Sequence, residues 1–327
     1  MRSHTTQTAF NKRKVIHFAI FFALLACAFH LSAPGAAAQG HTVLVEGNCD
    51  SPVPGTTLVA PGTCGDFDGD GRIGTAEDTD GADRIFGTIN AALGTGAGAA
   101  AGTGINHNGR VVIVRSGRFH ESIYIGQNLC GPGCPGAASP GNVTLEAAPG
   151  VDAVIDAQFQ GDPAGGNAAR LAATGIGVAY IPNTTTGLTR VVVLRNLTVR
   201  NFARGAEVSH NARVVIDNCR FENNLNYGVL LNFGALAVIK NSEITGTGFR
   251  TVTAAAANPG HGLVLDASAQ ARLVDTTVSH NANVGIYNAT GGAPNLVFYR
   301  VAAYFNGGGN TLGPFTSTLE PNSSLNN

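Results

Sequence analysis

The chain has 327 residues, 20 basic and 21 acidic side chains, 44 glycines and no tryptophan. After removal of an expected 38-residue leader, 16 basic and 21 acidic groups remain, a formal charge of −5. Nucleic acid is therefore excluded as an expected partner, because it demands a concentrated basic face.

Residues 1–38 are expected to be a cleaved secretory signal. The basic stretch "NKRK" at 11–14 precedes the apolar run "VIHFAIFFALLACAFHL", and small residues follow up to a cleavage position near Ala38. This order of basic, apolar and small residues is typical of export signals. An alternative is that Cys27, at the end of "LLAC", is a lipidation site. The protein is expected to be secreted, either extracellular or periplasmic.

The mature chain is expected to lack a transmembrane span, because no second apolar run is long enough to cross a bilayer. It is also expected to be a monomer. Its cysteines include two local pairs, Cys49 with Cys64 and Cys130 with Cys134. In an exported protein, each pair is expected to form a disulfide. Cys219 is left over, and we expect it to be a small buried apolar filler rather than a reactive thiol.

Residues 39–82 are expected to form an N-terminal segment that carries a calcium loop, "DFDGDGRIGTAE" at 66–77. The spacing matches an EF-hand loop, with Asp66, Asp68 and Asp70 at positions one, three and five, the carbonyl of Arg72 at seven and Glu77 at twelve. These oxygens suit one Ca²⁺. The preceding "PVPGTTLVAPGTCG" is too rich in proline and glycine for a sensor helix, so the site is expected to be structural. The alternative is an acidic turn that binds nothing.

A repeat of about 22 residues fills the second half of the chain. Its copies begin near 191, 214, 237 and 272, and a degenerate copy begins at 295. Each has a β-branched run, a polar slot, a turn, a glycine slot and a second apolar strand. The polar slot holds Asn196, Asn218, Asn241 and Asp275, and the glycine slot holds Gly205, Gly228, Gly262 and Gly285. Valine, isoleucine and asparagine with period-two alternation favour a β-solenoid over a leucine-rich repeat.

Each unit is expected to make one turn of three short strands, and stacking should pair each strand with its equivalents in the neighbouring turns. At the corner, the amide of the polar slot is expected to donate to one neighbouring coil and accept from the other. The interval between Gly228 and Gly262 contains about eleven extra residues, which indicates a loop projecting from one coil.

These repeats resemble those of right-handed parallel β-helix proteins of the pectin lyase-like superfamily. The resemblance extends upstream through "DRIFGTINAAL" (83–93), "GRVVIVRSGRFHESIYI" (109–125) and "NVTLEAAPGVDAVIDA" (142–157). It implies an all-β fold, a right-handed parallel β-helix of about seven coils over 83–310, with a capping helix at its start and a C-terminal tail at 311–327. Ile85, Ile89 and Leu93 would lie on one face of that helix.

Relatives in this superfamily are often enzymes that act on polysaccharides, so the resemblance implies extracellular polysaccharide as a partner. The motifs of the known enzymes are not matched here. "DRIFG" at 83–87 precedes the coils, and "GHG" at 260–262 lacks the upstream paired aspartates of polygalacturonases. Catalysis is therefore left open, and an enzyme would be a polysaccharide lyase or glycoside hydrolase. The alternative is a noncatalytic structural or cell-surface interaction β-helix with a structural calcium site.

Alternation after the glycine slot predicts which residues face outward. One outward column holds Glu207, Leu230, Val264 and Tyr287, and the column beside it holds Ser209, Asn232, Asp266 and Ala289. If the protein is catalytic, Glu207 and Asp266 are the candidate acid and base, with His261 orienting or relaying a proton. Strand geometry places the two carboxylate backbones about 12 Å apart, wide for a glycosidase pair.

Overall fold

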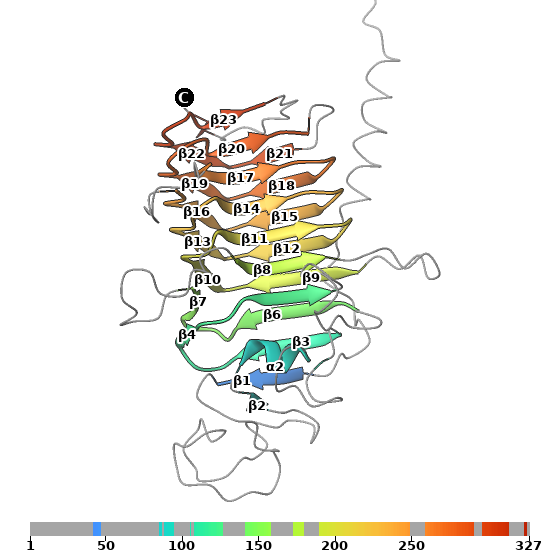
Figure 1. The fold of residues 1–327 in the computed structure, drawn as a ribbon. Helices are drawn as coiled ribbons and strands as arrows, with labels where there is room; N and C mark the ends of the chain where they lie inside the picture. Colours follow the sequence, from blue (N-terminus) through green and yellow to red (C-terminus); the bar gives the residue numbers. More distant parts are fainter. Residues whose placement is uncertain are drawn as a thin grey trace, which may run out of the picture. The chain divides into compact units, whose positions relative to one another are not determined.

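The computed structural model describes residues 42–46, 85–86, 88–94, 105, 108–126, 141–157, 173–179, 190–248, 259–290, 296–313 and 324–325. Residues 40–327 form one unit. Its described strands form three sheets. Each sheet runs along the whole stack of coils, from the N-terminal coils to the C-terminal ones (Figure 1).

Each sheet is built from parallel strands that are far apart in sequence. The first sheet has the order β2 (Ile85–Phe86), β1 (Thr42–Val45), β3 (Gly109–Ile113), β6 (Val143–Ala147), β9 (Val191–Arg195), β12 (Arg213–Asp217), β15 (Leu236–Lys240), β18 (Gln270–Val274) and β21 (Leu296–Tyr299). The second has the order β24 (Ser324–Leu325), β22 (Ala302–Tyr304), β19 (Thr277–Ser279), β16 (Glu243–Thr245), β13 (Arg220–Glu222), β10 (Leu197–Arg200), β7 (Ala153–Asp156) and β4 (Gly117–Phe119). The third has the order β23 (Thr311–Leu312), β20 (Ile286–Asn288), β17 (His261–Leu265), β14 (Tyr227–Leu231), β11 (Arg204–Ser209), β8 (Thr174–Ala179) and β5 (Ile123–Gly126).

Successive strands pass from the first sheet to the second and then to the third, so three strands complete one coil. Seven such coils run from β3, β4 and β5 to β21, β22 and β23 within the described residues. This confirms the prediction of a parallel β-solenoid of about seven coils. The first sheet also extends upstream, because β1 pairs in register with β3, Val43 opposite Val111.

The inward rows of the three sheets form one apolar core. In the third sheet, Ala206, Val208, Val229, Leu231, Leu263, Leu265 and Ile286 are all fully buried. Phe202, Phe221 and Phe298 are among the largest buried side chains. The period-two alternation predicted these inward positions, because the two faces of a strand alternate residue by residue.

The polar slot forms one corner of the coil, as predicted. Asn196, Asn218, Asn241 and Asp275 all have positive φ, between 47° and 58°. Asparagine and aspartate tolerate this left-handed conformation better than other non-glycine residues, which explains their recurrence. Their backbone N–H groups donate to carbonyls in the next coil, as in the 3.1 Å hydrogen bond from Asn196 to Asp217.

The predicted amide ladder along this corner is only partly formed. Nδ2 of Asn196 donates to the carbonyl of Ala147, and Nδ2 of Asn218 donates to Oδ1 of Asn196. Asn241 departs from the pattern, because its amide donates to Oδ1 of Asp217 instead of to Asn218. The carboxylate of Asp217 is a charged acceptor within reach, and charged acceptors form the stronger hydrogen bonds.

A second asparagine stack lies inside the coils, and the repeat analysis did not identify it. Asn224 and Asn281 are fully buried, and Asn306 lies in the last coil. Asn281 donates to the carbonyl of Ile244 and to Oδ1 of Asn306, and its own Oδ1 accepts from the N–H of Thr247. These amides satisfy backbone groups that the bend between the second and third sheets leaves unpaired inside the core.

The glycine slot marks a close approach between coils. A Cβ on Gly205, Gly228 or Gly262 would lie 2.5–2.7 Å from the carbonyl oxygen of the glycine in the following coil. Real Cβ atoms are not found at such distances, so only glycine fits. The predicted slot is confirmed, and Gly175 is an earlier member, because its Cβ would meet the carbonyl of Gly205 at 2.7 Å.

The expected N-terminal helix is shorter than the interpretation of 83–93 requires. Ile85 and Phe86 form β2, and the helix α2 spans only Ile89–Leu93. Thr88 ends the extended segment as the N-cap, its hydroxyl accepting from the N–H of Ala91. Glu121 accepts from the N–H groups of Ile89 and Asn90, which binds the helix start to the first coil. Its role as a cap over the end of the solenoid stays a prediction.

Several predictions concern residues outside the described part of the chain. They are the secretory signal at 1–38 with Cys27, the pairs Cys49 with Cys64 and Cys130 with Cys134, and the calcium loop at 66–77. Of the tail at 311–327, only residues 311–313 and 324–325 are described. Among the described helices, none has the length and apolar character that a membrane span requires.

Candidate functional site

The outer face of the third sheet presents three rows of side chains along the stack. Strand register aligns the members of each row. The first row is Thr174, Arg204, Tyr227 and His261; the second is Tyr124, Gly177, Glu207, Leu230, Val264, Tyr287 and Leu312; the third is Ser209, Asn232, Asp266 and Ala289. The second row confirms the predicted outward column. Leu230 and Val264 are nevertheless buried within it.

Glu207, on β11, is held by polar neighbours on the same face. Its Oε2 accepts from Thr174 Oγ1 at 3.3 Å and from Arg204 Nη1 at 3.1 Å. Its Oε1 accepts from Asn232 Nδ2, also at 3.3 Å. Both carboxylate oxygens therefore have partners on adjacent strands, which fixes the side chain.

Tyr124 lies two strands before Glu207 in the third sheet, and its pKa responds to the negative charge of the Glu207 carboxylate. The residue between them is Gly177, which has no side chain to separate them. Burial raises the pKa of Tyr124, and the negative charge of Glu207 raises it further. The phenol is thus a neutral hydrogen-bonding group at physiological pH.

His261 opens β17 and lies between two tyrosines. Its ring centroid is 6.3 Å from that of Tyr227, nearly parallel, and 5.3 Å from that of Tyr287. We call these three residues the aromatic strip. Nδ1 of His261 accepts from the N–H of Val284, and burial lowers the pKa of the imidazole. The ring is therefore neutral at pH 7, and it is buried, 9% exposed, between the two partly exposed tyrosines.

Asp266 follows β17 and is exposed. Its Oδ1 accepts from the N–H of Ala267 at 2.8 Å, at the start of a turn in which Ala267 and Ser268 both have positive φ. The carboxylate thus accepts a local backbone hydrogen bond at a strained corner.

The three candidate catalytic residues do not share a contact. Glu207 lies two strands from β17, His261 opens that strand, and Asp266 follows its other end. Their polar partners are all different. A general acid and base must both reach one scissile bond, and this arrangement supplies neither a hydrogen-bonded pair nor a relay between them. Their catalytic role stays a prediction.

The sequence analysis missed the residues that give this face its character. Tyr227 belongs to the strip, and Arg204 and Thr174 hydrogen-bond to Glu207. The signal was present, because Arg204, Tyr227 and His261 each directly precede the glycine slot. The residue before that glycine was not examined as a row of its own.

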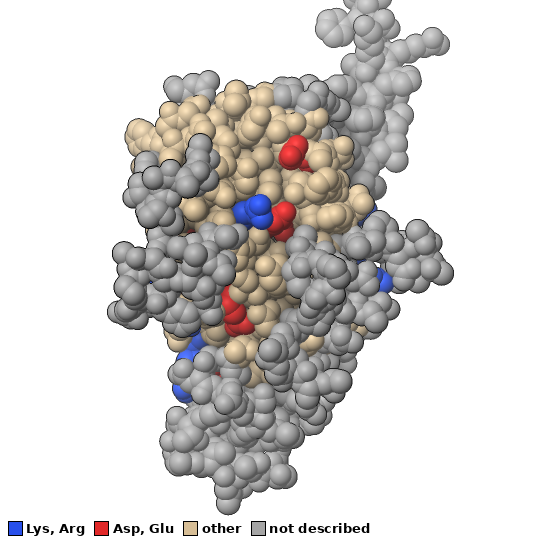
Figure 2. All heavy atoms as spheres, viewed as in Figure 1, with Lys and Arg blue, Asp and Glu red and all other residues tan. Residues whose placement is uncertain are grey.

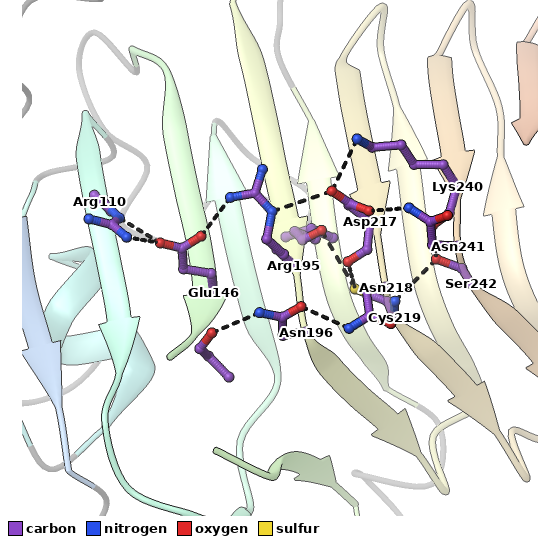
Figure 3. Close-up of polar contacts among 12 residues, drawn as sticks. Arg110, Glu146, Arg195, Asn196, Asp217, Asn218, Cys219, Lys240, Asn241 and Ser242 are labelled. Atoms are coloured by element: carbon purple, nitrogen blue, oxygen red, sulfur yellow. Dashed lines mark hydrogen bonds and ion pairs between the residues drawn. The ribbon is translucent and has the colours of Figure 1, made fainter. Parts of the chain in front are cut away.

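Several arginines on the first two sheets are paired with carboxylates. In the first sheet, Glu146, Arg195, Asp217 and Lys240 alternate in sign along one row, with Arg110 bound to Glu146 at its start (Figure 3). In the second sheet, Arg200 bridges Asp156 and Glu222, and Arg220 bridges Glu222 and Glu243. We call these rows of alternating charges ladders. Most of these ion pairs join side chains on neighbouring strands of one sheet and so link successive coils.

No group of three or more histidine, cysteine or carboxylate side chains converges as a metal site in the described ranges. The predicted ligands Asp66, Asp68, Asp70, Arg72 and Glu77 lie outside those ranges.

Comparison with known proteins identifies the repeat region. Residues 175–310 match the family described as the right handed beta helix region. Among solved structures, the crystal structure of pectate lyase Pel9A is similar over 68% of this chain and 70% of that chain, with 14% identity and a TM-score of 0.37. A likeness at that level does not bear on activity. No curated protein matches the sequence.

Proposed function

We propose that this chain, a right-handed parallel β-helix protein with the repeats of the pectin lyase-like superfamily, binds an extracellular polysaccharide along the outer face of its third sheet. The proposed role is recognition of the polymer rather than its cleavage. The extracellular setting rests on the leader at 1–38, and N-terminal sequencing of exported protein should begin at Gln39.

The aromatic strip is the observation that carries this proposal. Its rings belong to three consecutive strands, β14, β17 and β20, which span about 9.6 Å along the stack. Aromatic side chains combine a flat apolar surface with a polar edge, which suits the apolar faces and hydroxyl rims of sugar rings. A linear polymer lying along the stack would meet the partly exposed rings of Tyr227 and Tyr287, with the buried His261 between them.

Polar groups beside the strip supply hydrogen bonds. Asn232 follows the strand of Tyr227, β14, and Glu207 lies on the next strand, β11; both side chains are partly exposed. A binding site needs a few such groups to orient a ligand on an otherwise apolar surface.

The separation of the two carboxylates argues against cleavage. Glycosidases act with two carboxyl groups that reach one glycosidic bond, whereas Glu207 on β11 and Asp266 after β17 are two strands apart and share no hydrogen-bond partner. Binding requires no such pair.

A binding screen tests the proposal. Mature protein is assayed by affinity electrophoresis against a broad panel of neutral and acidic polysaccharides, and the products are analysed for released oligosaccharides. We expect binding to at least one polymer, no cleavage, and a loss of about tenfold in affinity for Tyr227→Ala and for Tyr287→Ala. Tyr299→Ala is the matched control, because Tyr299 lies on the first sheet beside Arg300.

Two results would contradict the proposal. Absence of binding to every polymer would favour the noncatalytic structural or cell-surface alternative. Depolymerisation that disappears in Glu207→Gln would instead favour an enzyme.

Calcium binding is proposed separately, from the donor set of the loop at 66–77. Asp66, Asp68, Asp70 and Glu77, with the carbonyl of Arg72, would give Ca²⁺ the oxygen ligands it prefers. Calorimetric titration of chelator-treated mature protein should show one ion bound per chain, lost in Asp68→Asn. Equal calcium binding by the parent and this variant would argue against the site.

A further inference from the structure

We infer that the polysaccharide bound by the outer face of the third sheet is an uncharged polymer, and not a polyuronate. This inference rests on the proposed function and names the class of ligand for the same face. It is drawn from the charges that the face presents.

Charged side chains are scarce on this face. In the described part of its three rows, the charged residues are Arg204, Glu207 and Asp266. His261 is neutral at pH 7 because burial lowers its pKa. Figure 2 views the molecule from the side on which β11, β14 and β17 are labelled in Figure 1, and most of the described surface there is neither acidic nor basic. The described rows carry a formal charge of −1.

The single cation of these rows is already neutralised. Nη1 of Arg204 lies 3.1 Å from Oε2 of Glu207, and the two side chains are 37% and 16% exposed. A polyuronate would have to compete with this carboxylate, which is pre-positioned on the same strand. The remaining charge, Asp266, would repel it.

Neighbouring segments of the sequence add few charges: 158–172, before β8, contains Asp162 and Arg170, and 249–258, before β17, contains Arg250. Residues 127–140 follow β5, 180–189 follow β8 and 291–295 follow β20, and none of the three contains an acidic or basic residue. On the other two sheets, Arg195, Arg200 and Arg220 are bound to carboxylates. A polyuronate carries a carboxylate on each sugar and would require a row of cations to match, because each desolvated charge needs a partner.

An uncharged polymer meets these features without a penalty. The two tyrosines of the aromatic strip offer apolar contact, and the partly exposed amide of Asn232 is a neutral hydrogen-bonding group. The carboxylate of Glu207 is also an acceptor for sugar hydroxyls.

Matched pairs of polymers test the inference. Polygalacturonate, alginate and glucuronoxylan are each compared with their carboxyl-reduced forms, which keep the linkages and lose the charge, alongside unsubstituted xylan, galactan and β-glucan. We expect a neutral polymer to be bound, its affinity to change less than about twofold between 20 and 500 mM NaCl, and no acidic parent to bind tighter than its reduced form.

Charge variants sharpen the test. Glu207→Gln releases Arg204 and should raise the affinity for polyuronate at low salt by about fivefold. Asp266→Asn removes the same charge without releasing a cation and should change it less than about twofold. Thermal melting confirms that both variants are folded.

The outcomes separate this inference from the proposed function. Tighter binding of an acidic parent, with affinity falling steeply as salt rises, would overturn the inference and leave glycan binding intact. Binding of no polymer in the panel would overturn both.

Discussion

Nδ2 of Asn218 donates a 2.9 Å hydrogen bond to Oδ1 of Asn196, one coil earlier in the stack. Both residues have positive φ, 53° and 58°. Their recurrence in the repeat therefore has two causes, a side chain that links coils and a backbone conformation that most residues resist.

The two causes can be separated at Asn218. Asn218→Ala should lower the free energy of unfolding by about 1–2 kcal/mol, because alanine loses the hydrogen bond and is strained in the left-handed region. Asn218→Gly loses only the hydrogen bond and the backbone preference of asparagine, and it should fall between the parent and the alanine variant. Denaturant unfolding measures all three, and a glycine variant less stable than the alanine variant would contradict the conformational explanation.

Asp217 is the central anion of the ladder on the first sheet. Burial alone would raise its pKa, but the hydrogen bonds from Asn241 and Lys240 and the charges of Lys240 and Arg195 outweigh it and lower the pKa. Asp217→Asn should cost about 1–2 kcal/mol of unfolding free energy at pH 7, because it leaves Arg195 and Lys240 facing each other.

The pH dependence of this effect has a definite sign. A lowered pKa in the folded state contributes stability above the ordinary value of 3.8, and that stability is lost as the pH falls through the folded value. The difference between parent and Asp217→Asn should therefore shrink below pH 3.8. A difference that stays constant down to pH 2 would show that the asparagine acts through packing alone.

Gly262 is predicted to be irreplaceable by alanine. A Cβ would lie 2.6 Å from the carbonyl of Gly285 and 2.7 Å from Val278 Cγ1, so the coils would have to move apart. Gly262→Ala should cost about 2–3 kcal/mol of unfolding free energy. Gly117→Ala is the matched control, because nothing lies within 4 Å of a Cβ there, and its change should stay within about 1 kcal/mol. Equal effects at both positions would refute the close-approach explanation.

His261 should make the fold sensitive to mild acid. Burial lowers its pKa below the ordinary 6.5, so the unfolded state binds a proton more readily and stability falls as the pH drops below 6.5. The melting temperature of the parent should therefore fall between pH 7.5 and pH 5.5 by more than that of His261→Phe, which keeps a ring between the tyrosines. Parallel pH profiles for the two proteins would place the sensitivity elsewhere.

Cys219 should be inert in the native protein. Its side chain is buried, and burial raises the pKa of the thiol to about 12. Unreduced mature protein should show no reaction with iodoacetamide at pH 8, and one labelled thiol after unfolding in urea if both predicted disulfides are formed. Labelling of the native protein would contradict the buried position, whereas five labelled thiols in urea would contradict the disulfides.

The repeat made much of the fold predictable. Once the slots at Asn196 and Gly205 were aligned with their later copies, strand alternation fixed which residues face inward and which residues lie in register. The rows through Val208 and Glu207 follow from that arithmetic. Local patterns without a repeat were weaker, and Ile85 shows why: its four-residue spacing to Ile89 fits a helix, but pairing with Leu44 places it in a strand.

Side-chain partnerships were harder to predict. Strand register brings several donors within reach of each carboxylate, and the side-chain rotamers decide which hydrogen bond forms. Nδ2 of Asn241, for example, donates to Oδ1 of Asp217 and not to the side chain of Asn218. The aromatic strip was overlooked because tyrosine is rare in the chain, 6 residues in all, whereas its effect depends on position along the stack. A few residues of a rare type can therefore determine the chemistry of one face when the fold brings them together.

The interval between Gly228 and Gly262 is longer than those on either side, yet Tyr227 still lies opposite His261 and Val229 opposite Leu263. Chain length between β16 and β17 is thus uncoupled from strand pairing, because the described residues on either side of the extra segment lie close together: a Cβ on Gly248 would be 2.6 Å from Cα of Gly260. The scaffold can therefore acquire or exchange a whole segment at this point without changing which residues pair in the coils on either side. Segments grafted there would stand beside His261, where they could alter what the face recognises while leaving the coils unchanged.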